Sequence, residues 1–245
     1  MVQAVLFFII ALLYATVGFG GGSGYIAILS FYDSDPAQLR FIALCCNIVV
    51  VSGGTYHFVK NKILSISKVW PFAITSIPMA FLGGTIQLKS NVFFITLAFA
   101  LFFAGVLMVS IKNDQNPLVK SSNKFSNAVI GGAIGFLSGL VGIGGGIFLA
   151  PILHLMRWDK PKVIAATASF FILVNSIFGL LGQMVSTSPS IDYKQLLLFI
   201  VAVLVGGQIG SRITVSWISQ SKVRALTAAL VIFASLRLIY KVLIA

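Results

Sequence analysis

Val17-Gly18-Phe19-Gly20-Gly21-Gly22 and Val141-Gly142-Ile143-Gly144-Gly145-Gly146 share one pattern and lie in opposite halves of the chain. Each stretch interrupts a long apolar segment, and the similarity continues into Ile28-Leu29 and Ile152-Leu153. Glycine adopts backbone angles closed to other residues and lets another chain or a ligand come close. Apolar helices broken at corresponding positions of two halves are typical of membrane transporters. We therefore expect a duplicated membrane protein that builds one site from both copies.

The composition is that of a membrane protein. Hydrophobic residues make up 58% of the 245 residues, charged residues make up 9%, and the mean hydropathy is +1.04. Soluble domains carry about 25% charged residues. The net charge of +12 is explained by Lys and Arg in short cytoplasmic loops. No folded basic face is available for nucleic acid, so no nucleic-acid partner is expected.

The apolar segments divide four and four around the polar stretch from Asn113 to Asn127. They are predicted at about residues 2–31, 36–59, 68–88, 91–111, 126–156, 161–185, 192–217 and 221–244. Pro36 and Pro161 open the second segment of each half, a favourable position for proline at a helix start. The predicted organisation is repeat 1 over residues 1–112, a cytoplasmic linker over 113–125 and repeat 2 over 126–245.

The basic residues indicate whether the two broken segments cross the membrane. If all eight segments cross, the basic residues divide almost equally between the two sides and specify no orientation. If segments 2–31 and 126–156 enter and turn back at the glycines, twelve of the 17 basic residues lie on one side, as expected for the cytoplasm. The fold class predicted is therefore an all-α polytopic membrane protein with two inverted repeats. Each repeat has a re-entrant hairpin and three transmembrane helices, and both termini are non-cytoplasmic. Two kinked spanning helices are the alternative.

An anion site is predicted where the hairpin tips meet. The second arm of each hairpin begins just after the glycines, and its first N–H groups lack intrahelical partners. Such helix starts favour anions, and Ser23 is expected to cap the first one. All five acids lie in loops and the chain has no glutamate, which argues against a cation substrate. Tight helix packing is the other explanation for the glycines.

The predicted substrate-binding residues combine the two tips with two amides from the following segments. Asn47 and Asn175 are the side chains to test first, although interhelical hydrogen bonding is their commoner role. Cys45 and Cys46 are either ligand contacts or small buried residues, and Arg212 either escorts an anion or snorkels to the headgroups. Neither a catalytic set nor a metal or cofactor site is expected, so the chain is not predicted to be an enzyme. The full set is Gly20, Gly21, Gly22, Ser23, Gly24, Asn47, Gly144, Gly145, Gly146, Ile147 and Asn175.

At these residues the chain resembles the TauE/SafE sulfite exporter family. The resemblance rests on the two G-x-GGG breaks, on the run Gly146-Ile147-Phe148-Leu149-Ala150-Pro151, and on Pro161 with the following Ala166-Thr167-Ala168-Ser169. It covers essentially the whole chain. It implies an inner-membrane permease for small sulfur-containing anions, such as sulfite or the organosulfonate sulfoacetate.

The two copies of the break are not chemically equal. The first copy has Ser23-Gly24-Tyr25 where the second has Ile147-Phe148-Leu149, and Ala27 in place of Pro151. The expected mechanism is alternating access by movement of the repeats around the site. An anion channel that uses the same helix starts is the alternative. The expected partners are the lipid bilayer, the anion and, as a candidate, a second copy of the chain in a homodimer.

Overall fold

The structure, a computed structural model, describes residues 1–32, 35–110, 123–213 and 220–244. Within these ranges the chain is all-helical and contains no strand, as predicted. Each half has the same order: a helix, a break, a short helix and three long helices. The elements are α1 (Val2–Ala15), α2 (Gly22–Leu29), η1 (Ser30–Tyr32), α3 (Pro36–Lys60), α4 (Ile66–Thr85), α5 (Ser90–Ser110), α6 (Lys124–Val141), α7 (Gly146–Leu155), α8 (Pro161–Ser186), α9 (Tyr193–Ile213) and α10 (Gln220–Ile244).

Local sequence signals set several helix starts. Pro36 and Pro161 are the first residues of α3 and α8, as predicted. Asp35 caps α3, because its carboxylate accepts a hydrogen bond from the backbone N–H of Gln38 at 3.4 Å. Asn123 caps α6 in the same way. The predicted linker over residues 113–125 lies mostly outside the described residues.

Six helices among the described residues are long and apolar enough to cross a membrane: α3, α4, α5, α6, α8 and α9. One of them, α6, was predicted as a hairpin arm but reaches a spanning length of 18 residues. The apolar described part of α10, Thr227–Tyr240, is shorter than a span. With 14 residues, α1 is about 21 Å long at 1.5 Å per residue, too short for a hydrocarbon core of about 30 Å.

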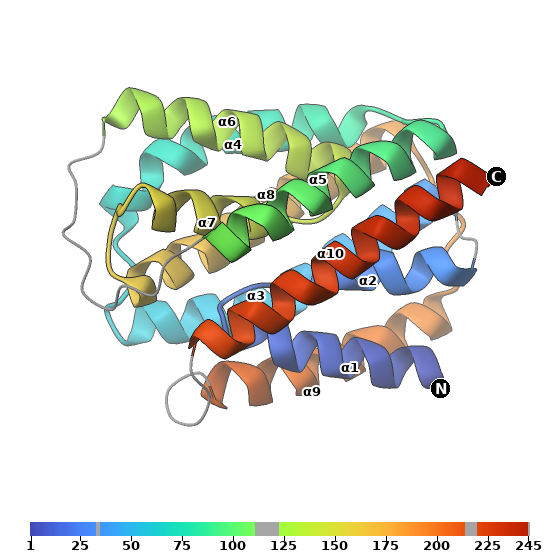
Figure 1. The fold of residues 1–245 in the computed structure, drawn as a ribbon, viewed down its shortest axis with the longest axis horizontal. Helices are drawn as coiled ribbons and strands as arrows, with labels where there is room; N and C mark the ends of the chain where they lie inside the picture. Colours follow the sequence, from blue (N-terminus) through green and yellow to red (C-terminus); the bar gives the residue numbers. More distant parts are fainter. Residues whose placement is uncertain (33–34, 111–122, 214–219, 245) are drawn as a thin grey trace.

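Both broken segments reverse direction (Figure 1). From its break, α2 runs back to the side of the molecule on which α1 begins, and α7 runs back to the side on which α6 begins. Side-chain contacts agree for the first pair. The Tyr14 hydroxyl lies 3.2 Å from Ser23 Oγ, and the rings of Phe7 and Tyr25 stack with centroids 4.7 Å apart. The end of α10 lies on the same side as the start of α1 (Figure 1).

The packing partners of one half recur in the other. The helix α1 packs along α9 as α6 packs along α4, and α2 lies on α3 as α7 lies on α8. Glycines bring these backbones together, since a methyl group added at Gly135 would lie 2.6 Å from Ser76 Cα. At Gly210 the added group would meet the Leu12 carbonyl oxygen. The hairpin arm of each half is therefore held by a helix of the other half. An inverted relation between the halves in the membrane stays a prediction.

Candidate functional site

The two glycine breaks each end one helix and start the next. The first joins α1 to α2 and the second joins α6 to α7. Gly21 and Gly145 are the N-cap residues of α2 and α7, with φ values of +95° and +80°. Residues with a Cβ rarely adopt such angles. The breaks therefore occur where the sequence places them, and glycine is needed for the chain to turn there.

The first turns of α2 and α7 present backbone N–H donors that have no acceptor within their own helix. The first helical bonds run from the N–H of Tyr25 to the Gly21 carbonyl at 3.0 Å and from the N–H of Phe148 to the Gly145 carbonyl at 3.1 Å. Earlier N–H groups have no intrahelical acceptor, and neither helix has a side-chain cap. The predicted cap by Ser23 is wrong. Ser23 lies inside α2, and its hydroxyl is occupied by Tyr14 at 3.2 Å.

Asn47 on α3 lies against both breaks. A methyl group added at Gly22 would lie 2.5 Å from Asn47 Nδ2, one at Gly144 would lie 2.9 Å from the same nitrogen, and one at Gly20 would meet Oδ1. The side chain is fully buried, and neither amide atom has a hydrogen-bond partner in the described part of the chain. Such an unsatisfied group costs about 1–3 kcal/mol. Its amide is therefore available to a ligand held between the two tips.

Ile172 and Ser176 on α8 face the second break. A methyl group at Gly144 would lie 2.7 Å from Ile172 Cγ2 and 2.9 Å from Ser176 Oγ, and one at Gly146 would meet Ile172. Ile172 thus has the place in the second half that Asn47 has in the first. Sequence reasoning missed Ser176, whose buried hydroxyl has no partner among the described residues. The sequence feature that could have identified Ser176 is its position directly after Asn175 in a predicted apolar segment.

Asn175 is buried and unpartnered within the described residues, as is Asn47. It is not the structural counterpart of Asn47, because Ile172 takes that position. Asn175 lies one turn before Gly179, whose added methyl group would sit 3.4 Å from Gly139 Cα. The structure therefore brings Asn47 to both tips, whereas Asn175 is not among the nearest atoms of the described tip glycines.

The remaining predicted tip residues face different neighbours. A methyl group at Gly21 would lie 2.7 Å from the Tyr25 hydroxyl oxygen, and one at Gly24 would lie 2.8 Å from Ile10. Ile147 is buried in the first turn of α7. Gly21 and Gly24 thus shape the first hairpin, whereas Gly20, Gly22 and Gly144 contact the free amide.

Arg40 on α3 was counted only as a basic residue of the non-cytoplasmic side, yet it is 3% exposed. Its guanidinium donates hydrogen bonds to the carbonyls of Gly84 at 2.8 Å, Ile86 at 2.9 Å and Gly139 at 2.9 Å. The sequence could have singled out Arg40, because this charge falls inside the predicted apolar segment 36–59. A charge within such a segment is expected to serve a function.

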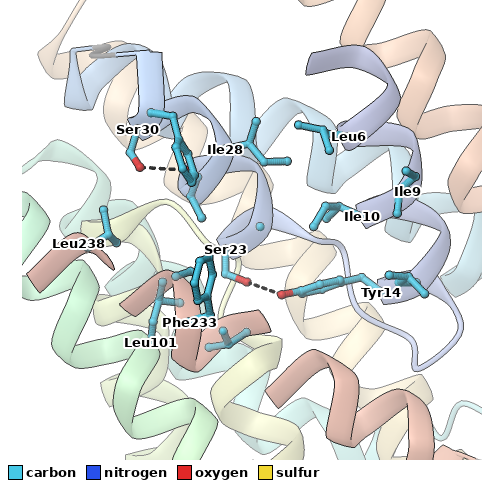
Figure 2. Close-up of a pocket in the computed structure, with 16 residues that line it drawn as sticks. Leu6, Ile9, Ile10, Tyr14, Ser23, Ile28, Ser30, Leu101, Phe233 and Leu238 are labelled. Carbon is cyan, nitrogen blue, oxygen red and sulfur yellow. Dashed lines mark hydrogen bonds between the residues drawn. The ribbon is translucent and has the colours of Figure 1, made fainter. Parts of the chain in front are cut away.

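A separate cavity of about 390 Å³ lies beside the first hairpin. Side chains of α1, α2, α5 and α10 line it, and the Tyr14–Ser23 hydrogen bond borders it (Figure 2). Ser30 also lines it, and its hydroxyl donates to the Ala27 carbonyl at 2.8 Å. The remaining labelled walls are aliphatic or aromatic, such as Leu6, Ile28 and Phe233. Apolar walls offer a small oxyanion few hydrogen bonds, so the unpartnered amide between the tips is the better site.

The family model described as Sulfite exporter TauE/SafE matches residues 3–238. The chain belongs to this family. The TauE/SafE protein described here is 34% identical to the probable membrane transporter protein y4hK of Sinorhizobium fredii, over 97% of both chains. It is 24% identical to the probable membrane transporter protein YunE of Bacillus subtilis, over 80% of this chain and 82% of the relative.

A third relative is the probable membrane transporter protein MJ0441 of Methanocaldococcus jannaschii, which is 27% identical over 76% of this chain and 73% of the relative. No solved structure matches the chain. The family and these relatives, together with the apolar helices, indicate a multi-pass membrane transporter of the TauE/SafE type.

Proposed function

We propose that this TauE/SafE transporter carries a small sulfur-containing oxyanion, sulfite or an organosulfonate such as sulfoacetate, across the inner membrane. The anion binds between the two hairpin tips, at Gly20–Gly24, Gly144–Ile147 and Asn47, with Asn175 at the edge of the site. The observation that carries this proposal is the fully buried Asn47 amide, which contacts both breaks and lacks a partner among the described residues.

The donors around this point suit an oxyanion. Free N–H groups begin α2 and α7, and the positive ends of both helix dipoles lie at the tips. The amide nitrogen of Asn47 and the hydroxyl of Ser176 add side-chain donors beside Gly144. In the described part of the chain, the buried Asp159 is paired with Lys68 at 2.6 Å. An oxyanion therefore meets donors at the tips, while this carboxylate is engaged elsewhere.

Alternating access is the mechanism we propose for transport. Each hairpin arm packs on a helix of the other half, α1 on α9 and α6 on α4. Movement of one half against the other would open the central site first to one face of the membrane and then to the other. The cytoplasmic face is assigned to the end with most of the basic residues. This assignment leaves both termini non-cytoplasmic.

Sulfite uptake into proteoliposomes tests the site. Gly22→Ala places a methyl group 2.5 Å from Asn47 Nδ2, and Gly146→Ala places one against Ile172. We expect either variant to lower sulfite flux at least tenfold, because the tips can no longer close around the anion. Gly132→Ala is the matched control, since its methyl group would lie 3.6 Å from the nearest atom of Thr75. Wild-type flux through the Gly22→Ala, Gly146→Ala double variant would overturn the proposed site.

The same vesicles separate a carrier from a channel. A carrier gives saturable flux and counterflow, in which unlabelled sulfite inside the vesicle accelerates entry of labelled sulfite. Single-channel currents without counterflow would overturn alternating access and leave the anion site in place.

A further inference from the structure

Arg40 is a buried charge whose hydrogen-bond acceptors, within the described residues, are all backbone carbonyls. Two of its acceptors, Gly84 and Ile86, lie at the C-terminal end of α4, and the third, Gly139, lies in the last turn of α6. Its Nε has no partner among the described residues. The carbonyl ends of two helices carry partial negative charge, which satisfies part of the guanidinium but does not neutralise it.

The carboxylates of the described residues are occupied elsewhere. Asp35 caps α3 through Gln38, Asp159 pairs with Lys68, and Asp192 accepts hydrogen bonds at the start of α9. A charge within a membrane span is costly, and its retention marks a function. Arg40 therefore has no carboxylate partner within the described part of the chain, where carbonyl dipoles hold its guanidinium.

The position of Arg40 connects this charge to the proposed site. Arg40 and Asn47 are seven residues apart on α3, two turns or about 10 Å along the axis. A methyl group added at Gly142 would lie 2.8 Å from Arg40 Cβ, while Gly144 lies against Asn47. The same helix thus places the stem of Arg40 and the amide of Asn47 against one break, and the Arg40 guanidinium lies beyond it at the carbonyls of α4 and α6. Arg40 also binds a carbonyl near the end of α6, where the negative end of the helix would otherwise repel an anion.

The second half has no such charge at the equivalent position. A methyl group added at Gly18, in the first break, would lie 3.2 Å from Cβ of Ala165 on α8. Ala165 thus contacts the first break as Arg40 contacts the second. The positive charge is a property of one half only.

We propose that Arg40 is a specificity-determining residue, whose buried charge, held by backbone carbonyls, makes the central site select anions. This inference rests on the proposed function and adds the origin of its charge selectivity. Arg40 acts on the anion through the electric field rather than by contact. A unit charge about 10 Å away in a protein interior changes the affinity for a singly charged ligand by about tenfold.

The test compares two ligands of similar shape and different charge on the purified full-length protein. Sulfoacetate carries two negative charges, and its amide, sulfoacetamide, carries one. For Arg40→Gln we expect the Kd for sulfoacetamide to rise about tenfold and the Kd for sulfoacetate about a hundredfold. Lys89→Gln is the control with unchanged affinities, because Lys89 is exposed in the α4–α5 connection. An equal rise for both ligands would show that Arg40 acts through packing alone and would overturn the inference.

Arg40→Lys keeps the charge but loses the fork that reaches three carbonyls. We expect this variant to unfold at a lower temperature and to retain both affinities within about threefold. If Arg40→Gln does not fold, the lysine variant decides, because loss of sulfoacetate binding in a folded Arg40→Lys protein would overturn a role of the charge. Failure of the proposed function is a different result: the wild-type protein would then bind neither ligand nor sulfite, and both proposals would fall together.

Discussion

The amide of Asn47 has no hydrogen-bond partner in the described part of the chain, unlike several buried hydroxyls of the spans. Thr55 and Ser169 bond to each other at 3.1 Å, and Ser235 donates to the Ala98 carbonyl at 2.9 Å. These pairs explain buried hydroxyls as links between helices. The amide of Asn47 makes no such link within the described residues, although it lies between two hairpins. Its cost to stability is understandable if the group binds a ligand.

Asn47→Leu is expected to separate stability from binding. Leucine is similar in size and removes an unsatisfied polar group, so we expect the ligand-free protein to be more stable by about 1–3 kcal/mol. Sulfite binding should fall at least tenfold, because the amide donor is lost. Thermal unfolding in detergent and calorimetric titration with sulfite measure the two effects.

A satisfied polar residue provides the control for this experiment. Thr75 donates to the Ala128 carbonyl at 2.6 Å, so Thr75→Val should lower the unfolding temperature and leave sulfite affinity unchanged. If the Asn47→Leu protein unfolds at a lower temperature than wild type and still binds sulfite, the role of Asn47 is structural.

At the scale of elements, the breaks and helix starts were predictable and the contacts between them were not. The effect of the glycine clusters, and of Pro36 and Pro161, is on their own backbone. It can therefore be predicted from the local sequence. Which side chains of α3 and α8 contact the tips depends on how these helices pack against the breaks, which the glycine motifs do not reveal. Ser23 was misassigned for the same reason. The Tyr14 hydroxyl, from the opposite arm, occupies the group that would have capped α2.

The α4–α6 contact makes an element-scale prediction with two adjacent glycines. A methyl group at Gly131 would lie 2.7 Å from Phe72 Cα, whereas one at Gly132 would lie 3.6 Å from Thr75. We expect Gly131→Ala to destabilise the protein by about 1–3 kcal/mol through overpacking. Gly132→Ala should be neutral or stabilising by up to about 1 kcal/mol, because alanine is the better helix former. Thermal melts that rank the two variants in the opposite order would contradict this packing.

At the scale of the whole molecule, the direction of the hairpins decides how the charges are distributed. The α3–α4 and α7–α8 connections lie at one end, and the α4–α5 and α8–α9 connections lie at the other (Figure 1). The charge pattern of the sequence pointed to this arrangement because basic residues gather at the first end. The membrane orientation, the inverted relation of the repeats and a homodimer stay predictions.

Cysteine labelling tests the orientation. In a Cys45→Ala, Cys46→Ala background, single cysteines replace Lys62, Arg157, Lys89 or Lys194, which are all exposed. With re-entrant hairpins, an impermeant maleimide should label positions 89 and 194 in spheroplasts, and positions 62 and 157 only after lysis. If both broken segments crossed the membrane, positions 62 and 194 would lie on one side and positions 89 and 157 on the other. That pairing would contradict the hairpins.

The unequal partners of the two breaks limit how the halves can be exchanged. A protein assembled from two copies of the first half would have two amides at its breaks, from Asn47, and two arginines about two helical turns away, from Arg40. One assembled from two copies of the second half would have Ile172 and Ala165 in those places and neither group. The two halves thus supply different groups at corresponding positions. We expect neither half to replace the other, so a gene encoding only one half would not regain the activity of the whole chain by dimerising.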